Sequence, residues 1–245
     1  MQVREAAPSS RAVEHRFYLV TTLSMLLAVA IGFSRSFFLR PLFPEWPSPS
    51  EPVFYLHGLL FAAWCVFLVG QAALVSGGRT PLHRTLGWYG AGLAAAMVAT
   101  GTYAALVAAN RPTGFTGIPV PPLQFLAVPA FDIALFPAFV ALAIAKRRDA
   151  EAHKRLMLLA TVNLLAAAFA RWPVVHAIGN PFLYFGLADL FIVAMAIRDL
   201  RTRGRLHPVV LWGGLAIIAS QPLRLALSGT PAWLAFASWA AGLVK

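Results

Sequence analysis

The chain has 245 residues, of which 59% are hydrophobic and only 12% are charged. A single soluble core cannot bury that much apolar surface, so lipid is expected to be the solvent for most of the chain. The net charge of +11 would suit a nucleic-acid partner, but the basic residues lie in short loops between apolar runs, which argues against that partner. Cys65 is the only cysteine, which excludes an intrachain disulfide and any cysteine-based zinc or iron–sulfur site.

The apolar runs predict an all-α, polytopic transmembrane helical bundle. A bilayer core about 30 Å thick requires roughly 20 apolar residues of helix. Seven spans are expected, at 17–39, 53–76, 86–109, 123–145, 156–178, 182–197 and 208–227. Residues 1–16 then form a cytoplasmic amino-terminal segment and 17–228 the seven-helix domain. Residues 229–245 form an apolar segment that is too short to span and either lies in the interface or re-enters the membrane.

The basic residues predict the orientation of these spans. Of the 20 Lys and Arg residues, 14 fall on one side: Arg4, Arg11, Arg16, Arg79, Arg84, Lys146, Arg147, Arg148, Lys154, Arg155, Arg198, Arg201, Arg203 and Arg205. Basic loops stay in the cytoplasm, so we expect a multi-pass protein of the inner (cytoplasmic) membrane with its amino terminus inside and its carboxyl terminus outside. The pattern makes no prediction of the oligomeric state.

Ionisable groups inside a membrane are costly unless they are paired or hydrated, so they are the first place to look for function. The outer half of the spans carries eight polar groups at similar depth: Arg35, His57, Tyr103, Asp132, Arg171, His176, Asp189 and Arg224. We expect ion pairs of Arg171 with Asp132 and of Arg35 or Arg224 with Asp189. A structural polar clamp and a substrate pocket that opens outward explain these groups equally well, and Arg35 and Arg224 could also snorkel to the interface.

The histidines suggest metal or haem ligation. His153 and His176 are 23 residues apart, or about 34 Å along a helix, so they cannot serve one site. Two sites would pair His57 with His176 near the outer face and His83 with His153 near the inner face. Each pair of imidazoles would suit a haem iron held between facing helices, or another metal. The alternative for the inner histidines, which include His207, is a solvated position in the interface.

A resemblance to a known family rests on three short motifs: His57-Gly58-Leu59 with Gln71, then His83-Arg84-Thr85-Leu86-Gly87, then His153-Lys154-Arg155-Leu156-Met157 followed by Arg171. The motifs resemble those of a poorly characterised family of bacterial multi-span inner-membrane proteins. That pattern is similar in turn to the four-histidine core of transmembrane b-type cytochromes and ferric-reductase-like proteins. The resemblance covers the second to fifth spans and implies a haem b cofactor with His57, His83 and His153 as ligands. His176 completes the set by geometry alone.

Several functions follow from these patterns. The first is a haem b-binding electron-transfer protein or membrane oxidoreductase that works with a redox partner or a quinone. The second is a transporter or small-molecule-binding membrane protein with a polar cavity in the outer half, where Asp132 and Asp189 carry protons and Arg171 contacts an anion. A metal-dependent hydrolase or hydroxylase is less favoured, because tight histidine clusters on one helix are absent from the sequence. An accessory subunit with purely structural polar groups is the remaining hypothesis.

Overall fold

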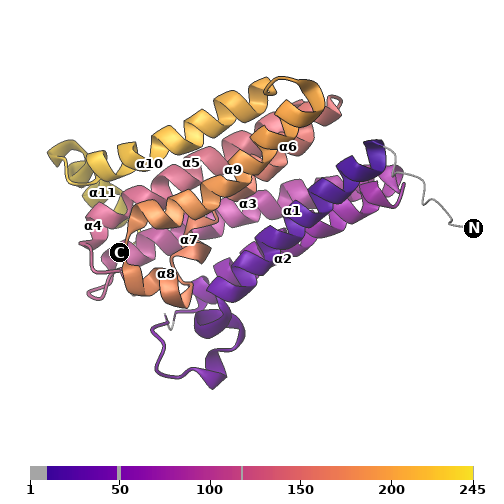
Figure 1. Ribbon diagram of the computed structural model, residues 1–245. Coiled ribbons are helices and arrows are strands. Elements are labelled where there is room, and N and C mark those ends of the chain that lie inside the picture. Colours follow the sequence, from indigo (N-terminus) through magenta and orange to yellow (C-terminus); the bar gives the residue numbers. More distant parts are fainter. Residues whose placement is uncertain (1–9, 49–50, 117, 245) are drawn as a thin grey trace, which may run out of the picture.

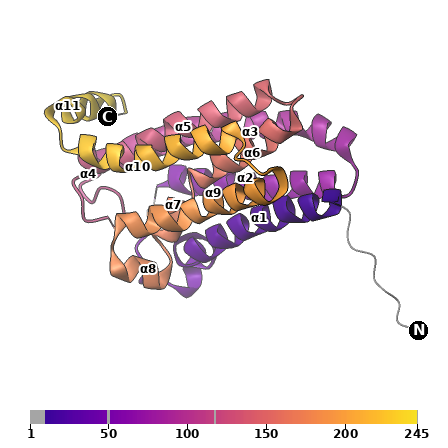
Figure 2. The same cartoon turned by 45° about the horizontal axis from the view of Figure 1, so that its top comes forward.

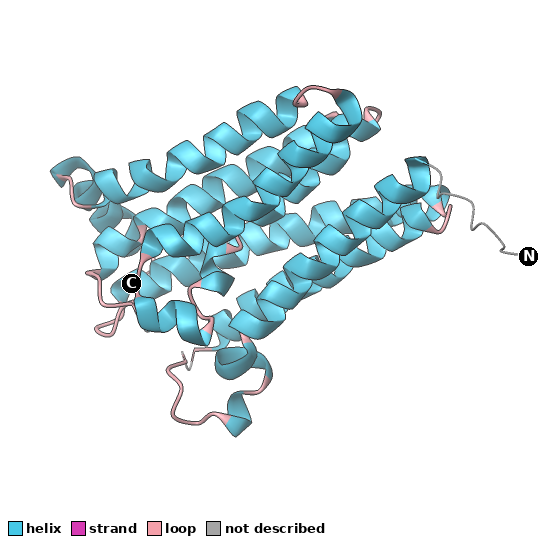
Figure 3. Ribbon diagram, viewed as in Figure 1, coloured by secondary structure: helices cyan, strands magenta, loops and turns pink. Residues whose placement is uncertain are grey.

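The computed structural model describes residues 10–48, 51–116 and 118–244, and every regular element in these ranges is a helix. The long helices run side by side in one bundle, as Figures 1 and 3 show. Arg4 and most of the expected cytoplasmic segment 1–16 lie outside the described residues. The prediction of an all-helical protein is confirmed for the described ranges.

Six helical segments of the described chain are long and apolar enough to cross a membrane. Their apolar sequences favour helices because lipid cannot hydrogen-bond to the backbone. They are α1 (Ser10–Gly32), α2 (Pro52–Ser76), α3 (Thr80–Asn110), α4 (Pro122–Phe125) continued by α5 (Ala127–Ala145), α9 (Pro181–Arg203), and the π-helical turn η3 (Val209–Gly213) continued by α10 (Gly214–Ser228). The remaining expected crossing, the fifth in chain order at 156–178, is interrupted.

This interrupted segment consists of three short helices, α6 (Ala150–Val162), α7 (Ala166–Phe169) and α8 (Pro173–Ile178). The expectation of one continuous helix over 156–178 is therefore corrected. At the first interruption the backbone tightens, because the amides of Leu164 and Leu165 bond to carbonyls only three residues back, both at 3.0 Å. At the second interruption, Trp172 precedes a proline and is extended, with ψ at 133°, as the proline ring requires.

Close packing against α1 accompanies the interruption. A Cβ added at Gly32 would lie only 2.2 Å from the carbonyl oxygen of Ala168 in α7. Only a glycine lets the two backbones approach this closely, as at other packed membrane helices. The Trp172 indole then donates from Nε1 to the carbonyl of Ala28, 3.0 Å away, which fixes the broken segment to α1 a second time.

One hydrogen bond between side chains joins α2 to α6 among the apolar residues of the bundle core. Trp64 on α2 is 1% exposed and donates from its indole Nε1 to the hydroxyl of Thr161 on α6 at 3.0 Å. Its ring also meets Phe136 of α5 edge to face, with ring centroids 5.1 Å apart. This bond satisfies both polar groups in the dry interior and holds α6 in place just before it ends.

The two ends of the bundle differ in their connections. The start of α1 lies at the same end as the α2–α3, α5–α6 and α9–α10 connections, which are the loops that carry the basic residues (Figure 1). The opposite end is covered by α11 (Pro231–Gly242), which turns back from α10 (Figure 2). The Trp233 indole of α11 donates to the Leu123 carbonyl at 2.8 Å, and the Asn110 amide of α3 donates to the Ala241 carbonyl at 2.6 Å. The apolar segment expected at 229–245 therefore packs across the end of α3 and α4.

Candidate functional site

A cavity of about 170 Å³ lies among α1, α2, α3, α5 and the broken segment. His57 and Asp132 are the two ionisable residues in its lining, and apolar side chains such as Phe33 and Met97 supply most of the remainder. The structure thus brings two of the predicted outer-half groups to one cavity. Leu164 and Ala167 from the interrupted segment form part of the wall, so the cavity adjoins the place where helix α6 ends.

His57 reaches the cavity from α2. Its ring lies against Gly101 of α3, where an added Cβ would be 3.2 Å from the His57 Cε1 atom. The Nδ1 atom of His57 is buried and has no hydrogen-bond partner in the structure. A buried polar atom without a partner costs free energy, so this nitrogen is available to a ligand or to a water molecule.

Asp132 enters the cavity from α5 and forms an ion pair with Arg224 of α10. The Arg224 Nη1 atom lies 2.7 Å from Asp132 Oδ1, and the arginine side chain is 2% exposed against 19% for the aspartate. Arg224 also donates from Nη2 to the hydroxyl of Ser220 at 2.9 Å. The pairing differs from the predicted one, because Arg224 and not Arg171 is the partner of Asp132.

Arg171 borders the same cavity from the end of α7 without meeting Asp132. Its Nη1 atom donates to the carbonyl of Ala167 at 2.6 Å, and its guanidinium carbon lies 4.7 Å from the centroid of the Phe33 ring. Both Phe33 and Ala167 line the cavity. The positive charge of Arg171 is therefore close to the cavity wall and is compensated by a carbonyl dipole and a ring face.

Asn163 lies at the point where α6 ends. Its amide Nδ2 donates to the main-chain carbonyl of Asp132 at 3.3 Å, while its Oδ1 is buried without a partner. Together with His57 Nδ1, this gives two unsatisfied polar atoms at or beside one cavity. The region has polar groups that the protein itself does not satisfy.

The other predicted outer-half groups lie elsewhere. Asp189 accepts a hydrogen bond from Gln221 Nε2 at 2.8 Å, which replaces the expected pairing with Arg35 or Arg224. Arg35 belongs to the π-helical turn η1 (Ser34–Phe38), and its guanidinium carbon lies 5.0 Å from the Trp46 ring centroid. Tyr103 is 51% exposed and does not line the cavity. These groups share a depth with the cavity residues but face other directions.

Of the four candidate histidine ligands, His83 and His153 lie side by side in the structure. The rings of His83 and His153 lie with centroids 6.2 Å apart and nearly perpendicular. His153 Nδ1 is 2.8 Å from the Ala143 carbonyl, which orients the ring, and His83 Nδ1 is buried without a partner. His176 is exposed, and its ring lies at a tilt of 54° to the Trp46 ring with centroids 5.4 Å apart. The pairing of His57 with His176 around a haem stays a prediction.

A second polar cluster, at the basic end of the bundle, was missed by the sequence analysis. Arg155 of α6 and Asp199 of α9 are both 1% exposed, and they form an ion pair in which Arg155 Nε also donates to Asp199 Oδ2 at 3.2 Å. Asp199 accepts a further bond from the backbone amide of His207 at 3.1 Å, and Glu151 pairs with Arg155 at 2.7 Å. The available signal was the single acid in the basic run Arg198-Asp199-Leu200-Arg201.

The pKa values of His207 and Glu151, at the basic end of the bundle, are shifted. Burial lowers the pKa of His207, and the positive charges of Arg155 and Arg203 lower it further. Partial burial alone would raise the pKa of Glu151, but hydrogen bonds from Lys154 and Arg155 outweigh it and lower that pKa to about 2. Neutral His207 accepts a bond from the Val209 amide at Nδ1, 3.1 Å away, so the network is built for an uncharged imidazole and an ionised carboxylate.

Comparison with known proteins identifies no relative that would assign a family to the fold or a role to the site. No protein family, curated protein or solved structure matches the chain. The resemblance to b-type cytochromes and ferric-reductase-like proteins therefore stays a prediction. Within the described ranges, no group of three or more His, Cys, Asp or Glu side chains is placed to hold a metal ion.

Proposed function

We propose that this protein is a transporter or small-molecule-binding membrane protein whose ligand occupies the cavity lined by His57 and Asp132. One observation supports this proposal above all: a cavity among helices of membrane-spanning length is lined by two ionisable side chains. Polar groups at such positions are costly, and in membrane proteins they mark substrate and ion pathways. The adjoining helix break is a further support, because discontinuous helices border the binding sites of many transporters.

The chemistry of the cavity restricts the ligand. Its volume of about 170 Å³ suits a solute of a few heavy atoms, since pockets for larger ligands begin at about 300 Å³. His57 Nδ1 and the Asp132 carboxylate offer a hydrogen-bonding ligand two contacts, and the Arg171 guanidinium adds positive charge at the border. A small anion or a small neutral polar solute fits these groups best, with Asp132 as the proton carrier, since Asp189 does not line the cavity.

The test compares three small probes on the purified protein in lipid nanodiscs: acetate, urea and methylammonium. We expect acetate or urea, but not methylammonium, to raise the midpoint of thermal unfolding. The gain should vanish in His57→Leu, which removes the imidazole from the lining, and in Asp132→Asn, which replaces the carboxylate with an uncharged amide. Tyr103→Phe is the matched control, because this exposed tyrosine lies off the cavity.

The same variants decide whether binding leads to transport. In proteoliposomes that contain a pH-sensitive dye, a gradient of the stabilising probe should move protons in the wild type and in Tyr103→Phe. Asp132→Asn should abolish that movement. Equal responses of all variants to all three probes, or no response at all, would remove the basis of the proposal.

A haem b-binding electron-transfer function is the second candidate, and the adjacent His83 and His153 rings favour it. His153 is held by the Ala143 carbonyl in the way that ligating histidines are usually held, which leaves its Nε2 atom for a metal. A haem bound there would supply one-electron chemistry, while His83 and His153 would hold it. The purified protein should then show a Soret band that His83→Ala abolishes and His176→Ala leaves unchanged, and a colourless wild type would contradict this candidate.

The placement in the inner membrane rests on the gathering of basic loops at one end of the bundle. We infer that this end, which includes residues 146–155, faces the cytoplasm, since basic loops are retained there. Reporter fusions within 146–149 should be active on the cytoplasmic side only. Periplasmic activity of such a fusion would reverse the orientation.

A further inference from the structure

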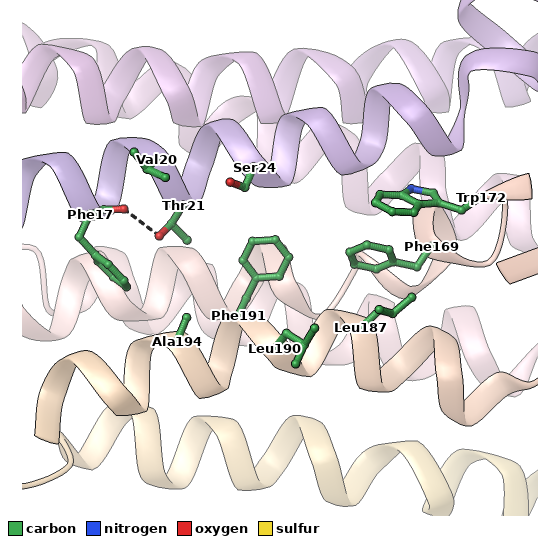
Figure 4. Close-up of a pocket in the computed structure, with 10 residues that line it drawn as sticks. All are labelled: Phe17, Val20, Thr21, Ser24, Phe169, Trp172, Leu187, Leu190, Phe191 and Ala194. Carbon is green, nitrogen blue, oxygen red and sulfur yellow. Dashed lines mark hydrogen bonds between the residues drawn. The ribbon is translucent and has the colours of Figure 1, made fainter. Parts of the chain in front are cut away.

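A second hollow, independent of the proposed ligand cavity, lies between α1 and α9. This groove has a volume of about 460 Å³ and is lined almost entirely by apolar side chains. Figure 4 shows Val20 and Ser24 of α1 facing Leu190 and Phe191 of α9 across it. Val20 is 52% and Leu190 58% exposed, so the walls of the groove are open to the surroundings.

Polar contacts hold α1 near each end of the groove. At one end the Trp172 indole bonds to the Ala28 carbonyl at 3.0 Å, and at the other Arg198 of α9 pairs with Glu14 of α1 at 3.5 Å. The hydroxyl of Thr21 is turned to its own helix, where it bonds to the Phe17 carbonyl at 2.8 Å, so it offers the groove little polarity. A polar solute would find almost no partners there.

The end of the groove near Phe17 is strongly basic. The guanidinium carbon of Arg198 lies 5.1 Å from the Phe17 ring centroid and 5.2 Å from that of Tyr18, and Lys154 Nζ lies 4.9 Å from the Tyr18 ring. Glu14 pairs with both cations, and Lys154 pairs with Glu151 as well. The described residues of α1 and the last turns of α9 carry more arginines than acids. The acids are Glu14 and Asp199, and the arginines are Arg11, Arg16, Arg198, Arg201 and Arg203.

We propose that this groove binds one acyl chain of an anionic phospholipid, with the phosphate of the lipid at the basic end between α1 and α9. The apolar walls suit a hydrocarbon chain and no polar ligand. The excess of arginines attracts a negative head group, as basic clusters at the membrane surface do. The phosphate lies near Arg198, with Arg16 and Arg201, both exposed, contributing to the attraction.

The test uses the full chain purified in detergent and native mass spectrometry. Phosphatidylglycerol or phosphatidylcholine with the same acyl chains is added back to delipidated protein. We expect one phosphatidylglycerol to remain bound at detergent concentrations that strip phosphatidylcholine. Ser24→Phe, which fills the groove, should reduce retention at least tenfold, whereas Ala134→Phe, a matched change on an exposed face of α5, should not.

The charge requirement is tested separately. Arg16→Gln with Arg201→Gln should weaken retention of phosphatidylglycerol by about fivefold per arginine, because each basic residue near a membrane surface contributes about 1 kcal/mol. Lys146→Gln with Arg148→Gln removes the same charge from another exposed loop at this end and should have little effect. Equal retention of both phospholipids, retention of an isoprenoid quinone in place of phospholipid, or loss in the control variants would overturn the proposal.

Discussion

Two buried ion pairs in this protein have opposite surroundings. At the basic end, the Arg155–Asp199 pair is enclosed, and nearly every polar atom around it has a protein partner: Glu151, Arg203 and the His207 amide complete the network. In the other half, the Arg224–Asp132 pair borders a cavity, and His57 Nδ1 and Asn163 Oδ1 are left unpartnered nearby.

This contrast separates two uses of buried charge. A fully satisfied network fixes helices against one another, and breaking one partner leaves a charge that nothing compensates. An incompletely satisfied cluster beside a cavity stabilises less and offers its free atoms to a ligand. A structural role suits the Arg155–Asp199 network, and a ligand-binding role for the His57–Asp132 cavity is our proposal. Experiments on Asp199, Asp132 and His207 probe that division, and one on Gly32 probes helix packing.

The largest effect is expected from Asp199→Ala. This variant leaves the Arg155 guanidinium, whose side chain is 1% exposed, without its buried carboxylate partner. The free energy of unfolding should fall by about 3–5 kcal/mol. The measurement is unfolding in mixed micelles of dodecyl maltoside and dodecyl sulfate. Arg201→Ala, at an exposed arginine of the same helix, should change it by less than about 0.5 kcal/mol. If the two variants are equally stable, the network does not hold the bundle together.

Gly32→Ala tests the close contact between α1 and the broken segment. The added methyl group would meet the Ala168 carbonyl at 2.2 Å, so the helices must separate, with a loss of about 3 kcal/mol. Gly92→Ala is the matched control on α3, where nothing lies within 4 Å of the added carbon, and it should stabilise slightly. Similar stabilities for both variants would show that α1 and α7 do not pack closely.

Asp132→Asn should cost less stability than Asp199→Ala, about 2 kcal/mol, because Arg224 keeps its bonds to Ser220 and the cavity can admit water. Its effect on ligand binding should be complete. The same unfolding assay, run beside the probe-binding assay, separates the two effects. A stability loss as large as that of Asp199→Ala would remove the distinction between the two regions.

The smallest expected effect is the dependence of stability on pH, which arises from His207 at the basic end. Because burial lowers the pKa of folded His207, the folded protein binds this proton less readily than the unfolded chain, whose histidine pKa is about 6.5. The contribution of His207 to stability is therefore present above about pH 6.5 and is lost as the pH falls below it. The carboxylate of Glu151, with its pKa at about 2, stays ionised throughout that range.

His207→Asn is the variant that isolates this titration. An asparagine keeps an acceptor for the Val209 amide but cannot become charged. The unfolding midpoint of the wild type should fall between about pH 7.5 and about pH 5.5, and that of His207→Asn should fall less. A parallel decline in both proteins would assign the pH dependence to another group.

The sequence predicted the helices well where composition alone decides them. The second span, expected at 53–76, corresponds to α2 at Pro52–Ser76. A long apolar segment forms a helix in lipid because a helix satisfies all its backbone hydrogen bonds internally. The interruption within 156–178 was not predicted. The proline after Trp172 was a visible signal for its second break, but the tight turn at Leu164 and Leu165 has no local signature.

The sequence predicted at which height along the spans the polar residues lie, but not toward which neighbouring helix each side chain points. The helical rise of 1.5 Å per residue predicted that His57, Asp132 and Arg224 lie at a similar height along their spans, which was enough to suggest a cluster. It could not say which side of each helix faces inward, so the partner of Asp132 was assigned to Arg171 and Tyr103 was included although it is exposed. Asp199 was overlooked because it lies within a run of basic residues that were treated as a loop.

The contact of α11 with α3 and α4, at the end of the bundle opposite the basic loops, has a consequence for biogenesis. The bond from Asn110 to the Ala241 carbonyl joins residues 131 positions apart, and the small side chains of Ala105 and Ala109 pack against Ala237 and Ala241. This seam can close only after all the intervening helices have been inserted. Until α11 is in place, the face of α3 that carries Ala105 and Ala109 is uncovered, so this end of the bundle is completed later than the packing among the preceding helices.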